Sequence, residues 1–142
     1  MSSTDSGNVK IRAAQQADCA ALAPFIHAFV EQQKLLPRTE TEVTELVEHG
    51  FVAECEGRIV GFSALEIYSP KMAEIRSLAV DASMQGRGLG KKLVNACVEL
   101  ARSEEILEVM AITSSDEFFQ SCGFDFTLPG EKKALFIHTR DN

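Results

Sequence analysis

The chain has 142 residues, 45% of them hydrophobic and 25% charged, which is typical of one globular domain. Its formal net charge of −7 argues against a nucleic-acid partner, because nucleic acids are bound through basic faces. No apolar run approaches the length that crosses a membrane, and the N-terminal residues lack the apolar core of a signal peptide. We therefore expect a cytoplasmic protein with no membrane partner.

The domain organisation is expected to be simple. Residues 1–8 are predicted to be a disordered tail and residues 9–142 one folded domain, because no repeat, low-complexity run or linker divides the chain. The cysteines form no CxxC pair, and the histidines are too few for a zinc site. We therefore expect no metal, and buried free thiols at Cys19, Cys55, Cys97 and Cys122.

The N-terminal part of the chain is predicted to form a strand followed by two helices. Val9–Ala13 is the strand, and Asp18 can cap a first helix. The apolar residues of that helix fall at helical spacing: Leu22, Phe25, Ile26, Phe29 and Val30. In the second helix, Thr39 and Glu42 form a capping box, and Gly50 is expected to be its C-terminal cap.

The middle of the chain is predicted to be a hairpin that leads into a central strand. Phe51–Cys55 and Arg58–Tyr68 read as strands, and the tight turn Glu56-Gly57 between them is typical of a β-hairpin. Ser69-Pro70-Lys71 then turns the chain into the central strand, Ala73–Val80.

The C-terminal part is predicted to complete a β-α-β unit. Helix Leu89–Arg102 carries apolar residues on one face and joins the central strand to a buried strand, Leu107–Thr113. A short helix, Asp116–Ser121, and a final strand, Ala134–Thr139, follow. The whole order, β-α-α-β-β-β-α-β-α-β, predicts an α/β fold with a mixed sheet and helices on both of its faces.

A glycine-rich turn lies between the central strand and the helix after it. Gly86, Gly88 and Gly90 leave backbone N–H groups unshielded at the positive end of that helix, so the turn predicts a phosphate-bearing ligand. A Rossmann turn is rejected because the third glycine comes one residue early. A P-loop is rejected because position 85 is Gln and Lys92 stands where Ser or Thr is needed. A glycine-rich turn without function remains the alternative.

The remaining spacing, Gln85-x-x-Gly88-x-Gly90 directly after a strand, resembles the Q/R-x-x-G-x-G/A motif of the GNAT N-acetyltransferases. The segment FFQSCGF, Phe118–Phe124, resembles the signature helix and Gly-Phe of this family, and the element order is similar to the GNAT fold. Within the family, the stretches LLPRT, AEIRSLAV and FF…GF are most similar to the acetyltransferase domain of N-acetylglutamate synthases. Many of those enzymes carry an amino-acid-kinase-like domain ahead of this one, and regulation through such a domain is not expected here.

The resemblance implies acetyl-CoA as co-substrate, with its pyrophosphate in the glycine-rich loop, and a small amine such as glutamate as acceptor. It also implies that the central strand splays from its neighbour and offers unpaired backbone groups. The N–H of Leu78 would face the acetyl oxygen, as an oxyanion donor typically worth ~3 kcal/mol, and that of Val80 the pantetheine arm. The implied coenzyme-binding residues are Leu78, Ala79, Val80, Gln85, Gly86, Arg87, Gly88, Leu89, Gly90 and Lys91. A homodimer is left open.

The resemblance also implies the acid–base groups. Glu74 occupies the position of the catalytic Glu in the histone-acetyltransferase branch, and the alternative is that it only pairs with Arg76. Most GNAT enzymes place a Tyr four residues before the Gly of the Gly-Phe signature, and this chain has Phe119 there. The group that protonates the leaving thiolate is therefore unassigned: water, a hydroxyl such as that of Ser115, or none.

Two arginines are candidates for binding the acceptor. Arg38 and Arg76 could hold its carboxylates, because a guanidinium forms bidentate bonds with a carboxylate and glutamate has two. The alternative is a pair of ordinary surface salt bridges. Two rival functions stay open: a transferase for a protein N-terminus, lysine or polyamine, and a non-catalytic module that binds acetyl-CoA.

Overall fold

The protein is described by a computed structural model over residues 8–127, 130–131 and 133–139. In this part of the chain, five strands form one mixed sheet in the order β1-β2-β3-β4-β5. Neighbouring strands are antiparallel except β4 and β5, which are parallel. The strands are β1 (Val9–Ala13), β2 (Gly50–Cys55), β3 (Arg58–Ser69), β4 (Met72–Val80) and β5 (Glu108–Met110).

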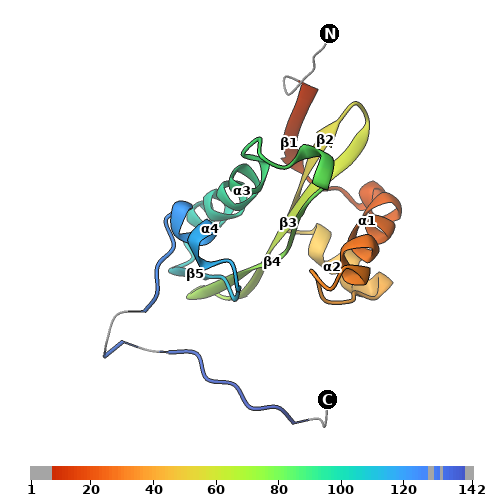
Figure 1. The fold of residues 1–142 in the computed structure, drawn as a ribbon. Coiled ribbons are helices and arrows are strands. Elements are labelled where there is room, and N and C mark those ends of the chain that lie inside the picture. Colours follow the sequence, from red (N-terminus) through yellow and green to blue (C-terminus); the bar gives the residue numbers. More distant parts are fainter. Residues whose placement is uncertain (1–7, 128–129, 132, 140–142) are drawn as a thin grey trace.

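The helices cover both faces of the sheet, as the sequence predicts. Helices α1 and α2 lie on one face, and α3 and α4 lie on the other (Figure 1). Among the helices of the described ranges, none combines the length and apolar character needed to cross a lipid bilayer. The helices are α1 (Cys19–Glu31), α2 (Glu40–Val47), α3 (Leu89–Ser103) and α4 (Asp116–Ser121), with short 3-10 turns at Gln16–Asp18 and Ala82–Met84.

Strand β3 lies in the middle of the core because it is buried on both faces. Phe62 and Ala64 pack under α1 and α2, whereas Ser63 and Leu65 face α3. Phe62 is fully buried, and burying an aromatic side chain of this size contributes about 1.5–3 kcal/mol. The alternation of side chains along one strand therefore fixes which helices cover which face.

Several predicted elements are confirmed with the same bounds, including β1 and α4. The turn of the β2–β3 hairpin is also confirmed, with Glu56 and Gly57 at φ values of 52° and 78°. Two such residues between antiparallel strands match the twist of a β-hairpin. The β4–α3–β5 unit has the predicted parallel pairing.

One predicted helix cap is wrong, and a second has the predicted position but no side-chain capping bond. Gly50 begins β2 instead of capping α2, and a Cβ there would lie 2.9 Å from both the Leu46 carbonyl oxygen and the Phe62 ring. Gly50 is therefore required for close packing and not for a turn. Asp18 stands at the start of α1, but its carboxylate accepts hydrogen bonds of 2.9 Å from both Nη atoms of Arg12. This pairing lowers the pKa of the Asp18 carboxyl below its ordinary value.

The predicted C-terminal strands are the main error in the fold. Strand β5 covers only Glu108–Met110, and Leu107 beside it is exposed. Ala134–Thr139 is not a strand: the segment runs away from the sheet (Figure 1), and Leu135 and Ile137 are 91% and 85% exposed. Apolar alternation gives a segment strand propensity, but a strand forms only where it can pair with another edge.

The cysteines are free thiols, as expected, but their predicted burial holds only for Cys97. The others, Cys19, Cys55 and Cys122, are partly exposed. Burial raises the pKa of the Cys97 thiol to about 11, so this thiol stays protonated at neutral pH.

The capping box at the start of α2 is confirmed, and it generates a first testable prediction. The Thr39 hydroxyl accepts from the Glu42 N–H at 3.1 Å, and Glu42 accepts from the Thr39 N–H at 2.8 Å. Replacing Thr39 by Ala should lower the free energy of unfolding by about 1 kcal/mol, because it leaves helix N–H groups unpaired. In a thermal melt this corresponds to roughly 2–4 °C.

The matched control is Thr41→Ala, an exposed position in the first turn of the same helix. It removes the same side chain without touching the cap and should leave the melting temperature nearly unchanged. Equal effects of the two substitutions would show that the cap contributes nothing specific.

Candidate active site

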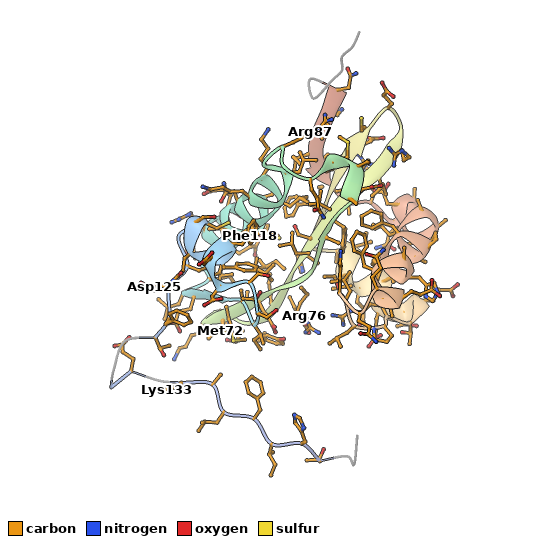
Figure 2. The ribbon with its side chains drawn as sticks, viewed as in Figure 1. Met72, Arg76, Arg87, Phe118, Asp125 and Lys133 are labelled. Atoms are coloured by element: carbon orange, nitrogen blue, oxygen red, sulfur yellow. The ribbon has the colours of Figure 1, made fainter. Side chains whose placement is uncertain are left out.

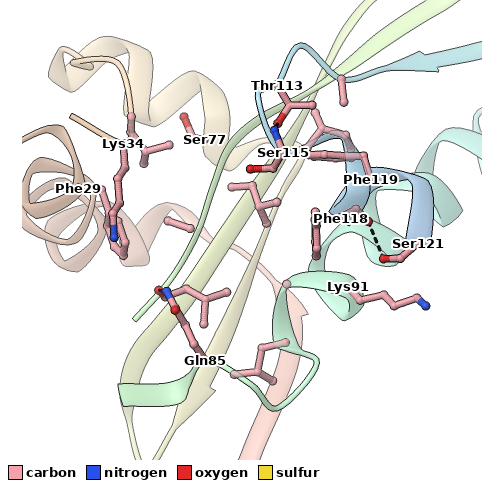
Figure 3. A pocket seen from close by; sticks show the side chains of 18 of the residues that line it. Phe29, Lys34, Ser77, Gln85, Lys91, Thr113, Ser115, Phe118, Phe119 and Ser121 are labelled. Carbon is pink, nitrogen blue, oxygen red and sulfur yellow. Dashed lines mark hydrogen bonds between the residues drawn. The ribbon is translucent and has the colours of Figure 1, made fainter. Parts of the chain in front are cut away.

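The candidate site is a cleft that opens where β4 and β5 part. Their pairing ends at Glu74 and Met110, and beyond it a cavity of about 870 Å³ lies between the second half of β4 and residues 111–115. Phe29 reaches the cavity from α1, Ser115 from the segment after β5, and Lys91 from the first turn of α3 (Figure 3). The splayed sheet that the resemblance implies is therefore present.

A β-bulge shapes the wall of the cleft that β4 provides. Ser77 and Leu78 together lie opposite the single residue Ser63, and Ser77 has a φ of 56°. The Ser77 hydroxyl is buried and has no hydrogen-bond partner among the described residues. The bulge bends the strand at this point and changes the direction in which its side chains point, and such bulges are common beside active sites.

Past the bulge, the backbone of β4 alternates between its neighbour and the cleft. The Asp81 N–H donates to the Val60 carbonyl at 2.8 Å, so it faces β3. The N–H and C=O of Val80 therefore point the opposite way, and the Val80 carbonyl accepts from the Gln85 side chain at 3.2 Å. By the same alternation, the N–H of Leu78 also faces the cleft.

The glycine-rich turn closes one end of the cleft. Gly86 and Gly88 have φ values of 83° and 77°, the left-handed region that glycine adopts without strain. The first N–H bonded into α3 is that of Lys92, which donates to the Gly88 carbonyl at 3.1 Å. Among the described residues, none accepts a hydrogen bond from the N–H groups of residues 86–91. These groups form the kind of helix N-terminus that binds phosphate.

The predicted coenzyme-binding residues gather around this cavity, with one exception. Arg87 is exposed and does not line it. Gly90 lines the cavity and also lets α4 approach, because a Cβ there would lie 3.3 Å from the Phe118 ring. The residues that line the cavity as predicted are Leu78, Ala79, Val80, Gln85, Gly86, Gly88, Leu89, Gly90 and Lys91.

A cluster of charged side chains surrounds Glu74 at the edge of the cleft. Glu74 does not line the cavity, but the next residue, Ile75, does. The Oε1 atom of Glu74 accepts a hydrogen bond of 2.5 Å from the Tyr68 hydroxyl and lies 3.7 Å from an Nη atom of Arg76. Arg76 also pairs with Glu66 at 2.6 Å. The pairing of Glu74 with Arg76 is thus present, but it is looser than the bond to Tyr68.

Arg38 lies beside this cluster, in the segment that joins α1 to α2. Burial lowers the pKa of its guanidinium, and so does the nearby positive charge of Arg76. The Arg38 Nε atom is buried without a hydrogen-bond partner among the described residues. The structure therefore brings the two predicted acceptor-binding arginines together, although Arg76 already has the ion pair that the alternative interpretation expected. Figure 2 shows Arg76 on the side of the sheet that faces α1 and α2.

A core residue, Phe119, occupies the position at which most GNAT enzymes have a tyrosine. Phe119 is buried, and its ring makes edge-to-face contacts with Phe118 at 5.1 Å and Phe124 at 5.3 Å between centroids. It supplies no proton donor. Ser115, the hydroxyl named as an alternative, does line the cavity.

The main residue that the sequence missed is Tyr68. Tyr68 precedes Glu74 by six positions, and the β3–β4 hairpin folds it back against Glu74. The signal was present in the short turn Ser69-Pro70-Lys71, since two strands joined by so tight a turn place residues on either side of it across from one another. Glu66, which lies directly opposite Glu74, could have been found the same way.

Comparison with known proteins agrees with this geometry. The sequence profile of the Acetyltransferase (GNAT) family matches residues 17–124. An uncharacterized N-acetyltransferase of Chlorobaculum tepidum is 31% identical over 80% of this chain and 74% of its own length. An amino-acid acetyltransferase of Mycobacterium tuberculosis is 31% identical over 80% of this chain and 67% of its own length.

Solved structures give the same assignment. A Mycobacterium tuberculosis protein in complex with CoA superposes with a TM-score of 0.74 at 30% identity, over 84% of this chain and 73% of that one. N-acetylglutamate synthase from Neisseria gonorrhoeae, complexed with coenzyme A and N-acetyl-glutamate, superposes with a TM-score of 0.76 at 28% identity. The match covers 87% of this chain but only 30% of the synthase.

The family profile thus spans most of the chain, and both relatives named exceed 30% identity over two thirds or more of their own length. The chain therefore belongs to the GNAT family, and it is an N-acetyltransferase whose co-substrate is acetyl-CoA.

Proposed function

We propose that this enzyme acetylates the amino group of a small amino acid that carries carboxylates, with glutamate as the first candidate. The observation that carries this proposal is the proximity of Arg38 to Arg76, next to the buried carboxylate of Glu74. Two guanidinium groups repel one another, and an anion placed between them removes that cost. The relatives named amino-acid acetyltransferase and N-acetylglutamate synthase support the same acceptor class.

The charges of the cluster also favour a zwitterion over a polycation. Arg38 and Arg76 lie near the carboxylates of Glu42, Glu66 and Glu74, so the cluster presents charges of both signs. An amino acid can place its ammonium near a carboxylate and its own carboxylates on the arginines. A polyamine or a lysine side chain would bring no carboxylate to the Arg38 Nε atom, which is buried without a hydrogen-bond partner among the described residues.

Acetyl-CoA is proposed to lie along the cleft, with its pyrophosphate on the N–H groups of residues 86–91. Its pantetheine arm would pair with the Val80 backbone, and the N–H of Leu78 would donate to the acetyl oxygen, where negative charge develops. The alternation of N–H groups past the bulge supports both roles, since these two groups face the cleft.

Glu74 is the proposed general base. One proton of the acceptor's ammonium passes to the Glu74 carboxylate, and the nitrogen lone pair then forms the C–N bond to the acetyl carbon. The nitrogen then gives up its second proton to water, the C–S bond breaks, and the sulfur leaves with the bonding electrons and is released as the thiol after taking up a proton. Since Phe119 has no acidic hydrogen and Ser115 lines the cavity, water or the Ser115 hydroxyl supplies that proton.

The acceptor class is tested by measuring thiol release from acetyl-CoA with a panel of amines. Glutamate and aspartate should be acetylated faster than glutamine, lysine, polyamines and peptide N-termini. Faster turnover of a cationic amine than of every amino acid with a side-chain carboxylate would overturn the proposal.

Gly88 generates a prediction for coenzyme binding. Gly88→Val should weaken acetyl-CoA binding at least tenfold by calorimetry, because a β-branched side chain strains the left-handed backbone and moves the N–H groups of the loop. The matched control is Gly57→Val in the β2–β3 turn, where φ is 78° against 77° at Gly88 and a Cβ is equally free of contacts. The control should lose similar stability and keep coenzyme affinity. A folded Gly88→Val protein with unchanged affinity would remove the loop from the site.

Arg38 generates a prediction for the acceptor. Arg38→Ala should raise the acceptor KM and lower kcat/KM for the acceptor about 30- to 150-fold, the equivalent of losing a charge-assisted contact of ~2–3 kcal/mol. The KM for acetyl-CoA should stay nearly constant. Arg38→Lys should recover only part of the loss, because an ammonium lacks the planar fork of a guanidinium.

Arg76→Ala should have a larger effect, since Arg76 also contacts the groups around Glu74. The control is Arg102→Ala, which removes only an exposed pair with Glu99 on α3 and should change neither KM. If Arg38→Ala leaves the acceptor kinetics of the wild type intact, the amino-acid assignment loses its structural support.

A further inference from the structure

Tyr68 occupies a defined place in the charged cluster that no part of the proposed reaction uses. It is the single tyrosine of the chain and lies near the end of β3, across the hairpin from Glu74. Its hydroxyl is 2.5 Å from Glu74 Oε1 and 3.3 Å from an Nη atom of Arg76. The phenol oxygen thus bridges the proposed base and one of the two proposed acceptor-binding arginines.

The direction of both hydrogen bonds follows from the chemistry of the partners. A guanidinium can only donate, so the Tyr68 oxygen accepts from Arg76. An ionised carboxylate can only accept, so the Tyr68 proton points at Glu74. Desolvation of the hydroxyl, together with the bond to Glu74 and its negative charge, raises the pKa of Tyr68 to about 12. The phenol therefore stays protonated, and remains a donor, at neutral pH.

This arrangement allows Tyr68 to act on the proposed base, Glu74, and not to protonate the leaving thiolate. The family tyrosine that Phe119 replaces would lie on α4, which covers one face of the sheet. The Tyr68 hydroxyl instead meets Glu74 and Arg76, and Arg76 is on the opposite, α1–α2 side (Figure 2). It does not line the cavity that holds the proposed coenzyme site.

We propose that Tyr68 is the positioning residue for the base: it fixes the Glu74 carboxylate through Oε1 and ties it to Arg76 of the acceptor site. Glu74 Oε2 receives no hydrogen bond from a described residue, so it is the oxygen that takes the proton from the acceptor's ammonium. The Tyr68 proton stays on the phenol throughout. This inference rests on the proposed role of Glu74 as base.

The kinetic test is Tyr68→Phe, assayed with whichever amine of the panel turns over fastest. We expect kcat to fall on the order of tenfold, since a hydrogen bond to a charged group is lost, while the KM for acetyl-CoA stays constant. The acidic limb of the pH profile should move to higher pH, because the ionised carboxylate loses a donor that favoured it. The other charged groups facing Glu74 are Glu66, Arg38 and Arg76, and all three remain in the variant.

The matched control is Ser69→Ala, which disturbs the same turn by removing the acceptor of the Lys71 N–H but leaves the phenol in place. It should keep the pH profile and kcat of the wild type. A Tyr68→Phe enzyme with an unmoved acidic limb, or a Ser69→Ala enzyme with the same shift, would overturn the positioning role.

A second test needs no acceptor, so it can succeed or fail independently of the proposed function. Tyr68 is the single tyrosine and the chain has no tryptophan, so the near-ultraviolet phenolate band reports this hydroxyl alone. At about pH 10.5 a free phenol is mostly ionised, whereas Tyr68 should remain protonated in the folded enzyme. In Glu74→Gln the phenolate band should appear at lower pH, because the negative charge is gone.

The control for the optical titration is Glu99→Gln, an exposed carboxylate on α3 that pairs with Arg102. It should titrate as the wild type does. Ionisation of Tyr68 at the pH of a free phenol in the wild type, or an identical titration in Glu74→Gln, would show that the hydroxyl is not bound to Glu74 in solution.

Discussion

The site depends on one constraint: β4 and β5 pair over only three residues and then separate. Parallel strands in a sheet normally continue their hydrogen bonding, and backbone groups left without it must find other partners. Here the pairing with β5 stops at Glu74, and beyond it the N–H groups of Leu78 and Val80 face a cavity. A coenzyme arm rich in amides is a natural partner for such an edge. The same separation brings the end of β4 next to the turn at Gly88, so amide partners and phosphate partners follow one another along one groove.

The bulge at Ser77 divides the chemistry between the two faces of the sheet. Before the bulge, the polar side chains of Glu74 and Arg76 meet Tyr68 and Arg38 on the α1–α2 side. After it, Leu78 and Val80 pack towards α3 and leave their backbone groups to the cleft. In the proposed reaction, acceptor and acetyl group would thus approach from different sides of one strand. Positioning two reactants in this way can supply much of the rate acceleration of a bimolecular transfer.

The sequence predicts best what is decided locally. The capping box of Thr39, the turn at Glu56-Gly57 and the glycine-rich loop each depend on a few neighbouring residues, and all three have the expected geometry. The bond between Tyr68 and Glu74 depends on strand register, and the pairing of Asp18 with Arg12 in place of a helix cap depends on a contact that only folding creates.

The missing final strand has a different cause. Its apolar alternation is present in the sequence, but whether a strand forms depends on an available edge, which no local pattern encodes. The proximity of Arg38 to Arg76 was predictable only in part. The sequence identifies both arginines as candidates, but the distance between them depends on how α1 and α2 pack on the sheet. The fold was therefore largely predictable, and the contacts within the site were predictable only in part.

The close approach of Phe118 to Gly90 joins two walls of the cleft. The Phe118 ring rests on the first turn of α3 where a methyl group would otherwise stand, so the two positions share a single volume. A larger residue at position 90 would therefore require a smaller one at position 118. The width of the cleft at this end, where the pyrophosphate is proposed to bind, thus depends on both side chains. A compensated pair of substitutions at these two positions would therefore change the shape of the cleft without touching a reacting atom.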